Sequence, residues 1–201
     1  MACGPTPWAL LGVTAARATA GEVLLARHGE TDDNRPPLRF QGWRDTPLND
    51  IGRRQAAELA QRVAAEPPSV LWSSDLSRAR ATAEIVARRL ELSVRVDPRL
   101  REANRGDWEG RLFDDVAREE PEAYAAWMRA GPQWRFPGGE SLLEQQQRVL
   151  ACLREIRDQG EPRSLAVCHG GSIRVVLCDS DPRGLEAFHT FRVPNVAVVK
   201  V

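Results

Sequence analysis

Short apolar runs alternate along this chain with longer segments in which apolar residues recur every three or four positions. A short continuous apolar run is typical of a buried strand, and the longer spacing is typical of a helix with one buried face. The apolar runs lie at 23–26, 70–72, 94–96, 164–168 and 196–199. Strands joined through long helical connections run parallel. The pattern therefore predicts an α/β fold with a mostly parallel central sheet and helices on both faces, an α/β/α sandwich.

Capping signals place the first two helices. Asn49 is the predicted N-cap of a helix that ends near Pro67-Pro68, and its side chain can accept a hydrogen bond from the first turn. The stripe expected on this helix consists of Ile51, Gln55, Leu59 and Val63. A second helix is expected to begin near Asp75, which puts Arg78 in its first turn. The N–H groups of a first turn attract anions, and a nearby arginine adds to that effect.

Residues 111–160 are expected to form a helical excursion between two strands. Pro121 begins one helix, and Ser141 and Glu144 form a capping box at the start of another,. The residues expected to pack from the Pro121 helix into the core are Tyr124, Trp127 and Met128. A later helix, which begins near Ile173, is expected to be cut short at 179–182 by an Asp-Ser-Asp-Pro sequence.

The length of the chain, 201 residues, is that of one domain. We expect residues 22–201 to form this domain and residues 1–21 to be a poorly ordered N-terminal extension. Residues 8–13 are apolar and Ala18-Thr19-Ala20 resembles a signal cleavage site, but no basic residue precedes the run, so an export signal is disfavoured. No segment is long and apolar enough to span a bilayer.

Charge and cysteine content narrow the possible partners. Lysine plus arginine and aspartate plus glutamate both total 28, so the net charge is zero. This balance gives no reason to expect a nucleic-acid or membrane partner. The cysteines Cys3, Cys152, Cys168 and Cys178 show neither metal nor disulfide spacing, which favours a reducing cytoplasm.

Reactive residues follow four of the predicted strands. Arg27-His28-Gly29 follows the first, Arg78 the second, Glu102 the third, and His169-Gly170 the fourth. Taken singly, an arginine or glutamate of this kind is usually a solvated surface group. The carboxyl ends of parallel strands, however, meet at one edge of the sheet, where α/β proteins place their sites. Arginine binds phosphate in a fork, and neutral imidazole can attack phosphorus, so the set predicts phosphoryl chemistry.

Ordered motifs then identify a resemblance. They are Arg27-His28-Gly29-Glu30-Thr31 with Asn34, Gln41-Gly42, Asp45-Thr46-Pro47-Leu48, Ser73-Ser74-Asp75-Leu76 with Arg78 and Thr82, Leu100-Arg101-Glu102, 106–110, 137–141 and His169-Gly170-Gly171. In this order they resemble the histidine phosphatase superfamily, which has the phosphoglycerate-mutase-like fold. The resemblance covers residues 22–201.

The resemblance implies a phosphoryl transfer in two steps. His28 would be the nucleophile, with its second ring nitrogen donating to a backbone carbonyl. Arg27, Arg78 and His169 would hold the phosphoryl oxygens. Glu102 would protonate the leaving oxygen, with a pKa between that of a free glutamate and neutrality. Further phosphate or substrate contacts are expected from Gly29, Asn34, Gln41 and Gly170. No metal and no cofactor is expected.

Some features depart from the family pattern and leave alternatives open. Asp33 replaces a common aromatic residue and would either influence substrate choice or face solvent, and Pro36-Pro37 stiffens the same loop. The segment between Glu102 and His169 is short, whereas mutases resemble one another in a longer basic insertion there. A phosphomonoester hydrolase is therefore favoured over a cofactor-dependent phosphoglycerate mutase.

Two other classes of protein fit the sequence less well. A metal hydrolase could use His28, His169 and His189, but no pair of them has zinc spacing,. A non-catalytic phospho-ligand or protein-binding module is disfavoured because both the histidine and the acid are present. The expected partner is a small phosphomonoester. The sequence leaves open whether this is a sugar phosphate, a phosphoglycerate derivative, α-ribazole phosphate or a phosphoprotein, and it leaves the oligomeric state open.

Overall fold

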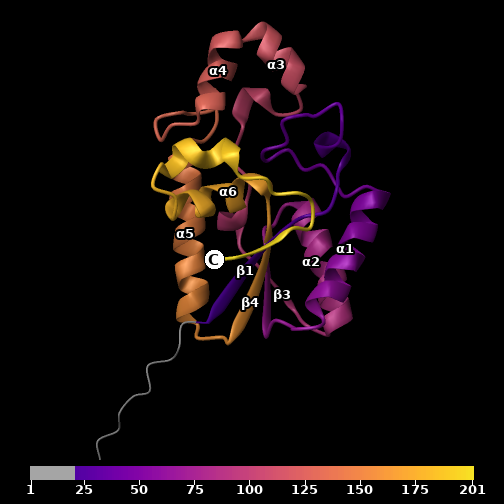
Figure 1. Cartoon of the computed structure of the whole chain (residues 1–201). Helices are drawn as coiled ribbons and strands as arrows, with labels where there is room; N and C mark the ends of the chain where they lie inside the picture. The colour runs from indigo at the N-terminus through magenta and orange to yellow at the C-terminus, as the bar shows by residue number, and fades with distance from the viewer. Residues whose placement is uncertain (1–20) are drawn as a thin grey trace, which may run out of the picture.

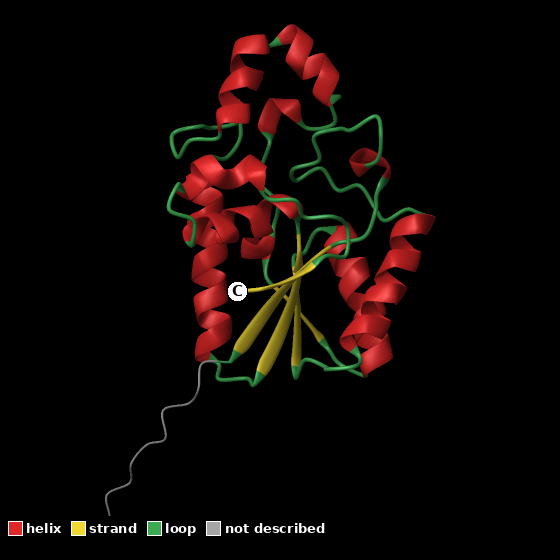
Figure 2. Cartoon of the chain, in the orientation of Figure 1, coloured by secondary structure: helices red, strands yellow, loops and turns green. Residues whose placement is uncertain are grey.

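A five-stranded sheet lies between two layers of helices in the computed structural model, which describes residues 21–201 (Figures 1 and 2). The strands are β1 (Glu22–Arg27), β2 (Val70–Ser73), β3 (Val94–Val96), β4 (Arg163–Cys168) and β5 (Val198–Lys200). Their order is β3-β2-β4-β1-β5, and only β5 runs antiparallel to its neighbour. The predicted fold class is thus confirmed. Residues 1–20 of the predicted N-terminal extension lie outside the described residues.

Helices cover both faces of this sheet (Figure 1). One face is covered by α1 (Asp50–Val63) and α2 (Ser77–Leu90), and the other by α5 (Leu142–Asp158) and α6 (Gly170–Asp179). The helices α3 (Phe113–Glu119) and α4 (Pro121–Arg129) lie beyond the sheet (Figure 1). Along β1, Val23 and Leu25 pack against α5 and α6, whereas Leu24 and Ala26 pack against α1 and α2. Both sets are buried because both faces are covered, which explains the continuous apolar run. Among residues 21–201, no helix combines the length and apolar character needed to cross a membrane.

The predicted elements differ from the observed ones in three places. The buried residues of α1 are Gly52, Ala56, Leu59, Ala60 and Val63, so its inner face is rotated from the expected stripe and Ile51 is 42% exposed. Met128 is also exposed, because α4 buries only Trp127 against the rest of the molecule. The last strand begins at Val198 rather than Val196, since Val196 has a φ of +52°, which a strand does not accommodate.

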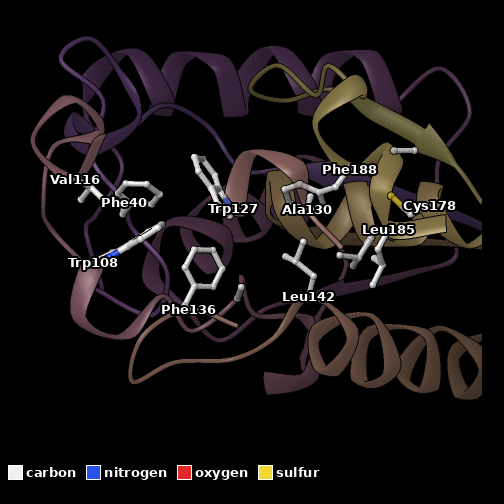
Figure 3. Close-up of a cluster of buried hydrophobic side chains, with 13 residues drawn as sticks. Phe40, Trp108, Val116, Trp127, Ala130, Phe136, Leu142, Cys178, Leu185 and Phe188 are labelled. Atoms are coloured by element: carbon white, nitrogen blue, oxygen red, sulfur yellow. The ribbon is translucent and has the colours of Figure 1, made fainter. Parts of the chain in front are cut away.

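The helices α3 and α4 project beyond the carboxyl edge of the sheet and are packed on an aromatic cluster (Figures 1 and 3). Phe40, Trp108, Trp127 and Phe136 form the centre of this cluster and are buried. Neighbouring rings pack tilted or edge to face, with Phe40 and Trp108 centroids 5.1 Å apart, the arrangement that aromatic quadrupoles favour. The cluster therefore anchors the loop that contains Phe40 above the end of the sheet.

Strand pairing aligns the ends of β1 and β4. Arg27 lies opposite Cys168, and the backbone N–H of His28 donates to the carbonyl of Cys168 at 3.0 Å. The residues that follow these two strands are His28 and His169. Parallel pairing that continues to the last residue of both strands therefore sets the two histidines next to each other.

Backbone contact between α1 and the chain after β1 depends on two glycines. A Cβ atom on Gly52 would lie 2.1 Å from the carbonyl oxygen of Glu30, and one on Gly29 would lie 2.3 Å from the carbonyl oxygen of Gly52. No L side chain fits at those distances without backbone movement. Glycine at both positions lets the first turn of α1 pack directly against the segment that follows His28.

We predict that Gly52→Ala destabilises the fold by about 1–3 kcal/mol, because the added methyl group overpacks this contact. Gly131→Ala is the matched control: a Cβ atom there has no heavy atom within 4 Å, so its stability should be unchanged or slightly raised. Denaturant or thermal unfolding of the three proteins measures both effects. Equal stability of Gly52→Ala and the wild-type protein would contradict the packing described here.

Candidate active site

The four predicted strand ends meet at one edge of the sheet. His28 follows β1, and His169 follows β4 as the residue before α6. Their ring centroids are 5.1 Å apart. Arg78 lies in the first turn of α2, and Glu102 follows the short 3₁₀ helix Pro98–Leu100 after β3. All four side chains are buried, which isolated surface groups would not be.

His28 is held in one tautomer. Its Nδ1 lies 2.7 Å from the carbonyl oxygen of Gly29, and a carbonyl can only accept a hydrogen bond. The proton therefore belongs on Nδ1, and Nε2 keeps its lone pair. The pKa of His28 lies well below its usual 6.5, because burial disfavours the charged ring and Arg78, His169 and Arg27 add positive charge nearby,. The ring is thus a neutral base with a free nitrogen, as nucleophilic attack requires.

Buried hydrogen-bond donors without protein acceptors surround this ring. Within residues 21–201 they include Nε of Arg27, Nε of Arg78, Nδ1 of His169 and Nδ2 of Asn34. Burying a donor without a partner costs free energy. A cluster of such donors at the carboxyl edge of a parallel sheet is what a site for an anion requires.

Other atoms of the same side chains fix their orientation. Nη1 of Arg27 donates to the carbonyl of Val193 at 2.7 Å. The two Nη groups of Arg78 donate to the carbonyls of Arg44 and Gly42 at 2.9 and 2.8 Å. The Nε2 of His169 lies 2.9 Å from Oγ of Ser74. The donors are therefore oriented by the protein before any ligand binds, which avoids reorganisation during reaction.

The chain before β5 supports the end of β1. The Nδ2 of Asn195 donates to the carbonyl of His28 at 3.1 Å, and the N–H of Val196 donates to the carbonyl of Arg27 at 3.1 Å. The left-handed backbone of Val196, at φ +52°, is unfavourable for a β-branched residue. Strain of this kind persists where surrounding contacts impose it, and such positions cluster at functional sites.

The loop after His28 supplies Asn34 and Gln41, both of which line a cavity beside His28. Oδ1 of Asn34 accepts from the N–H of Thr31 at 3.0 Å, and Nε2 of Gln41 donates to Oγ1 of Thr31. Thr31 therefore orients both predicted substrate contacts. Asp33, by contrast, is buried and pairs with Arg44 at 3.4 Å. Asp33 therefore does not face solvent, the second of the two alternatives expected for it.

The two glycines predicted at the site have different positions. Gly170 lines the cavity beside His28, together with Gly171. Gly29 packs against α1 instead, and its N–H donates to Oγ1 of Thr82 at 3.1 Å. The structure therefore assigns Gly29 to packing and does not place it on the cavity wall.

The Glu102 carboxylate accepts three hydrogen bonds. Oε2 accepts from the N–H of Gly171 at 2.9 Å. Oε1 accepts from the N–H of Ala103 at 3.0 Å and from Nε2 of Gln145 at 2.9 Å. Burial raises the pKa of Glu102, but the positive charge of Arg105 and these hydrogen bonds outweigh burial and lower the pKa to about 2. The expected pKa, above that of a free glutamate, is therefore wrong for the ligand-free site.

Gln145 and Arg148 were not among the predicted site residues. Both lie on α5, and Arg148 donates to the carbonyls of Arg99, Arg101 and Glu102 at 2.7, 2.8 and 2.9 Å. Arg148 also pairs with Glu140 at 2.6 Å. It thus holds the segment that carries Glu102. The signal for Gln145 was available: it is a polar residue at helical spacing between the apolar Leu142 and Val149.

The cavity beside His28 has a volume of about 240 Å³. This is below the usual range for drug-sized ligands, so it suits a small molecule or one end of a larger one. Glu102 and the arginines Arg27, Arg39, Arg105 and Arg174 line it. Sequence reasoning did not single out the last three of these arginines.

The residues proposed above for a metal site do not form one. Within residues 21–201, no group of three or more histidine, cysteine, aspartate or glutamate side chains is arranged to hold a metal ion. His189 contacts the carbonyl of Trp127 through Nε2 at 2.9 Å and packs on the Trp127 and Phe188 rings. It is part of the aromatic packing around α4.

Comparison with known proteins assigns this arrangement to a family. The model of the histidine phosphatase superfamily (branch 1) matches residues 23–201. Glucosyl-3-phosphoglycerate phosphatase of Mycobacterium tuberculosis is 36% identical over 163 residues, covering 77% of this chain and 72% of that protein. A probable phosphoglycerate mutase of Cronobacter sakazakii is 36% identical over 183 residues, covering 90% and 84%.

Solved structures agree with the family match. The crystal structure of a putative alpha-ribazole-5'-P phosphatase from Escherichia coli has a TM-score of 0.79 to this chain at 29% identity, covering 90% of this chain and 91% of that one. The fold, the ordered site residues and the family model coincide over the same residues. This chain belongs to the histidine phosphatase superfamily.

Proposed function

We propose that this protein hydrolyses small phosphorylated metabolites through a phosphohistidine intermediate on His28. The observation that carries the proposal is the neutral His28 ring, with Nδ1 bound to the Gly29 carbonyl and Nε2 free, among buried donors that have no protein acceptor. The similar proteins named as glucosyl-3-phosphoglycerate and alpha-ribazole phosphatases support a small phosphomonoester as substrate.

In the first step, Nε2 of His28 attacks phosphorus. An N–P bond forms while the ester P–O bond breaks. Arg27, Arg78 and His169 donate to the remaining phosphoryl oxygens, where fixed donors stabilise the charge of the transferring group. Because these side chains are oriented by backbone carbonyls and Ser74, the stabilisation costs little reorganisation.

Glu102 serves as the acid in this step. With a pKa of about 2 in the ligand-free site, it is ionised near neutral pH and must gain a proton before it can donate one. A bound phosphate places negative charge beside the carboxylate, and a like charge raises a carboxyl pKa. We infer that Glu102 takes up a proton as substrate binds and then transfers it to the leaving oxygen.

In the second step, a water molecule attacks the phosphohistidine. Glu102, now ionised, accepts the proton of that water, the N–P bond breaks, and inorganic phosphate leaves with His28 regenerated. Both halves use the same histidine and the same carboxylate, so the scheme requires no metal ion and no cofactor.

Phosphoglycerate mutase activity is the second candidate, because one similar protein is named a probable phosphoglycerate mutase. In a mutase, the phosphohistidine would return its phosphoryl group to a substrate hydroxyl rather than to water. Leu38 lines the cavity and is 44% exposed, and Arg39 beside it is also exposed. Solvent thus has access to the site, and we favour water as acceptor.

We also propose a reducing cytoplasm as the location of the protein and a small molecule as its partner. Cys152, Cys168 and Cys178 are free and buried, which supports the reducing cytoplasm expected from the sequence. The balanced charge of 28 basic and 28 acidic residues and the small cavity support a small-molecule partner rather than nucleic acid or a membrane.

We predict that the wild-type protein hydrolyses p-nitrophenyl phosphate with release of inorganic phosphate, in the presence of excess chelator. His28→Ala should lower kcat by at least about 10⁴-fold, because it removes the nucleophile. Gly131→Ala, in which the added Cβ atom has no heavy atom within 4 Å, is the control. Interconversion of 2- and 3-phosphoglycerate without phosphate release would instead identify a mutase, and unchanged hydrolysis by His28→Ala would refute the scheme.

We further predict that Glu102→Gln depends on the leaving group. For alkyl phosphates, whose leaving alkoxide needs a proton, kcat/KM should fall by about 10²–10⁴-fold. For p-nitrophenyl phosphate, whose leaving group is stable as an anion, the loss should be much smaller. Measurement of kcat/KM with a series of phosphate esters tests this. An equal loss for all leaving groups would show that Glu102 does not act as the acid.

A further inference from the structure

Three arginines of the cavity wall, Arg39, Arg105 and Arg174, have no part in the proposed phosphoryl transfer, and of these Arg39 is exposed. Arg105 follows Glu102 in the loop after β3, and Arg174 lies on α6. Both line the cavity beside His28. The transferring phosphoryl group carries at most about two negative charges, and Arg27 and Arg78 already match these.

Arg105 is buried, with only 9% of its surface exposed. Within residues 21–201 its Nη1 has no hydrogen-bond partner. The nearest carboxylate is that of Glu102, with Oε2 3.9 Å from Nη2. That distance is too long for a hydrogen bond, and the Glu102 oxygens already accept from Gly171, Ala103 and Gln145. The guanidinium of Arg105 therefore faces Glu102 only as a long ion pair, and its Nη1 is left to bind a further anion.

Aromatic rings surround the rest of the Arg105 guanidinium. Its Cζ lies 5.1, 5.5 and 5.9 Å from the ring centroids of Phe136, Phe40 and Trp127, residues of the cluster shown in Figure 3. The rings stabilise the cation, hold it in place and exclude water from it. A buried charge of this kind is costly unless something pairs with it. The position thus favours an anion that arrives with the ligand.

Arg174 is partly buried and also lies against an aromatic ring. Its Nε donates to the carbonyl of Phe191 at 3.0 Å, and its Cζ lies 5.5 Å from the ring centroid of Phe188. Among residues 21–201, its Nη groups have no hydrogen-bond or salt-bridge partner. Burial lowers the pKa of Arg27 and the pKa of Arg105, and the positive charge of Arg174 lowers both further. The three cations are therefore close to one another, with Glu102 as the one carboxylate on the cavity wall.

We propose that Arg105 and Arg174 form a second anion subsite, so that the preferred substrates are small phosphomonoesters with a second anionic group, a carboxylate or another phosphate. The guanidinium fork suits either group. The cavity of about 240 Å³ limits the spacer between the two groups to a few atoms. This inference rests on the proposed function, because it places the reacting phosphoryl group at His28.

Three esters with the same spacer test the subsite: 3-hydroxypropyl phosphate, 3-(phosphonooxy)propanoate and propane-1,3-diyl bisphosphate. For the wild-type protein, kcat/KM for at least one of the two anionic esters should exceed that for the hydroxyl ester by about 10–100-fold, as expected for a hydrogen bond to a charged group. Which of the two is preferred distinguishes a carboxylate from a second phosphate. Equal kcat/KM for all three esters would overturn the proposal.

Variants test whether Arg105 and Arg174 cause the preference for anionic esters. Arg105→Met and, separately, Arg174→Gln should reduce the ratio of anionic to hydroxyl ester kcat/KM towards one. Arg80→Met is the control: Arg80 is an exposed residue of α2 that pairs with Glu84, and the ratio should keep its wild-type value. If Arg105→Met fails to fold, Arg174→Gln decides the matter. An unchanged ratio in the folded variants, or an equal fall in Arg80→Met, would refute the subsite.

A binding measurement separates this inference from the proposed chemistry. In His28→Ala, which should not turn over substrate, calorimetry should show tighter binding of the preferred anionic ester than of the hydroxyl ester, and Arg105→Met in that background should remove the difference. If p-nitrophenyl phosphate is hydrolysed by the wild-type protein in a His28-dependent way but no ester preference exists, the subsite alone is wrong. If no ester is hydrolysed, the proposed function is wrong.

Discussion

The parallel pairing of β1 with β4 is the constraint on which the site depends. The two strands stay in register up to Arg27 and Cys168, and one more backbone hydrogen bond joins His28 to Cys168. A shift in register by one residue would reverse the side of the sheet to which each side chain points. It would also separate the two histidine rings, which lie 5.1 Å apart. The packing of β1 residues against helices on both faces makes such a shift costly.

An excess of arginines over carboxylates around the cavity is the second feature of the molecule. Arg27, Arg78 and Arg105 are withdrawn from water, and each keeps a buried nitrogen without an acceptor among residues 21–201. Favourable contacts offset the free-energy cost of burying these charges. The aromatic cluster surrounds Arg105, and residues of α5 hold Glu102 in place. Such a site is unfavourable alone and becomes favourable with a bound anion, which is the property that an enzyme for phosphoryl transfer needs.

Much of the fold was predictable from the sequence, because it depends on local patterns. Continuous apolar runs indicated doubly covered strands, and the capping box at Ser141 is present in the structure. The face of α1 was not predictable, since it is set by the contact between Gly52 and Glu30. The pKa of Glu102 could not be predicted from the sequence either, because it depends on Arg105 and on backbone N–H groups of Gly171 and Ala103 that only the folded chain brings together.

Within the site, motif and strand-end reasoning located His28, His169, Arg78 and Glu102 and part of the cavity wall, but it did not single out Arg39, Arg105 and Arg174. Arg105 and Arg174 resemble ordinary surface arginines in a chain that has many. Their role depends on burial by Phe40, Phe136 and Phe188, residues distant in sequence. The residues proposed to perform the chemistry follow strands and can be located from a pattern, whereas the arginines that line the cavity depend on tertiary packing.

The central claim is that the phosphoryl group passes through His28, and trapping of the intermediate tests it most directly. Wild-type protein mixed with substrate for a time shorter than one turnover and quenched in alkali should carry one phosphoryl group. Peptide mapping should place it on His28, and acid should remove it. A phosphoryl group on a serine or aspartate would contradict the account, as would rapid release of the leaving group with no phosphorylated histidine.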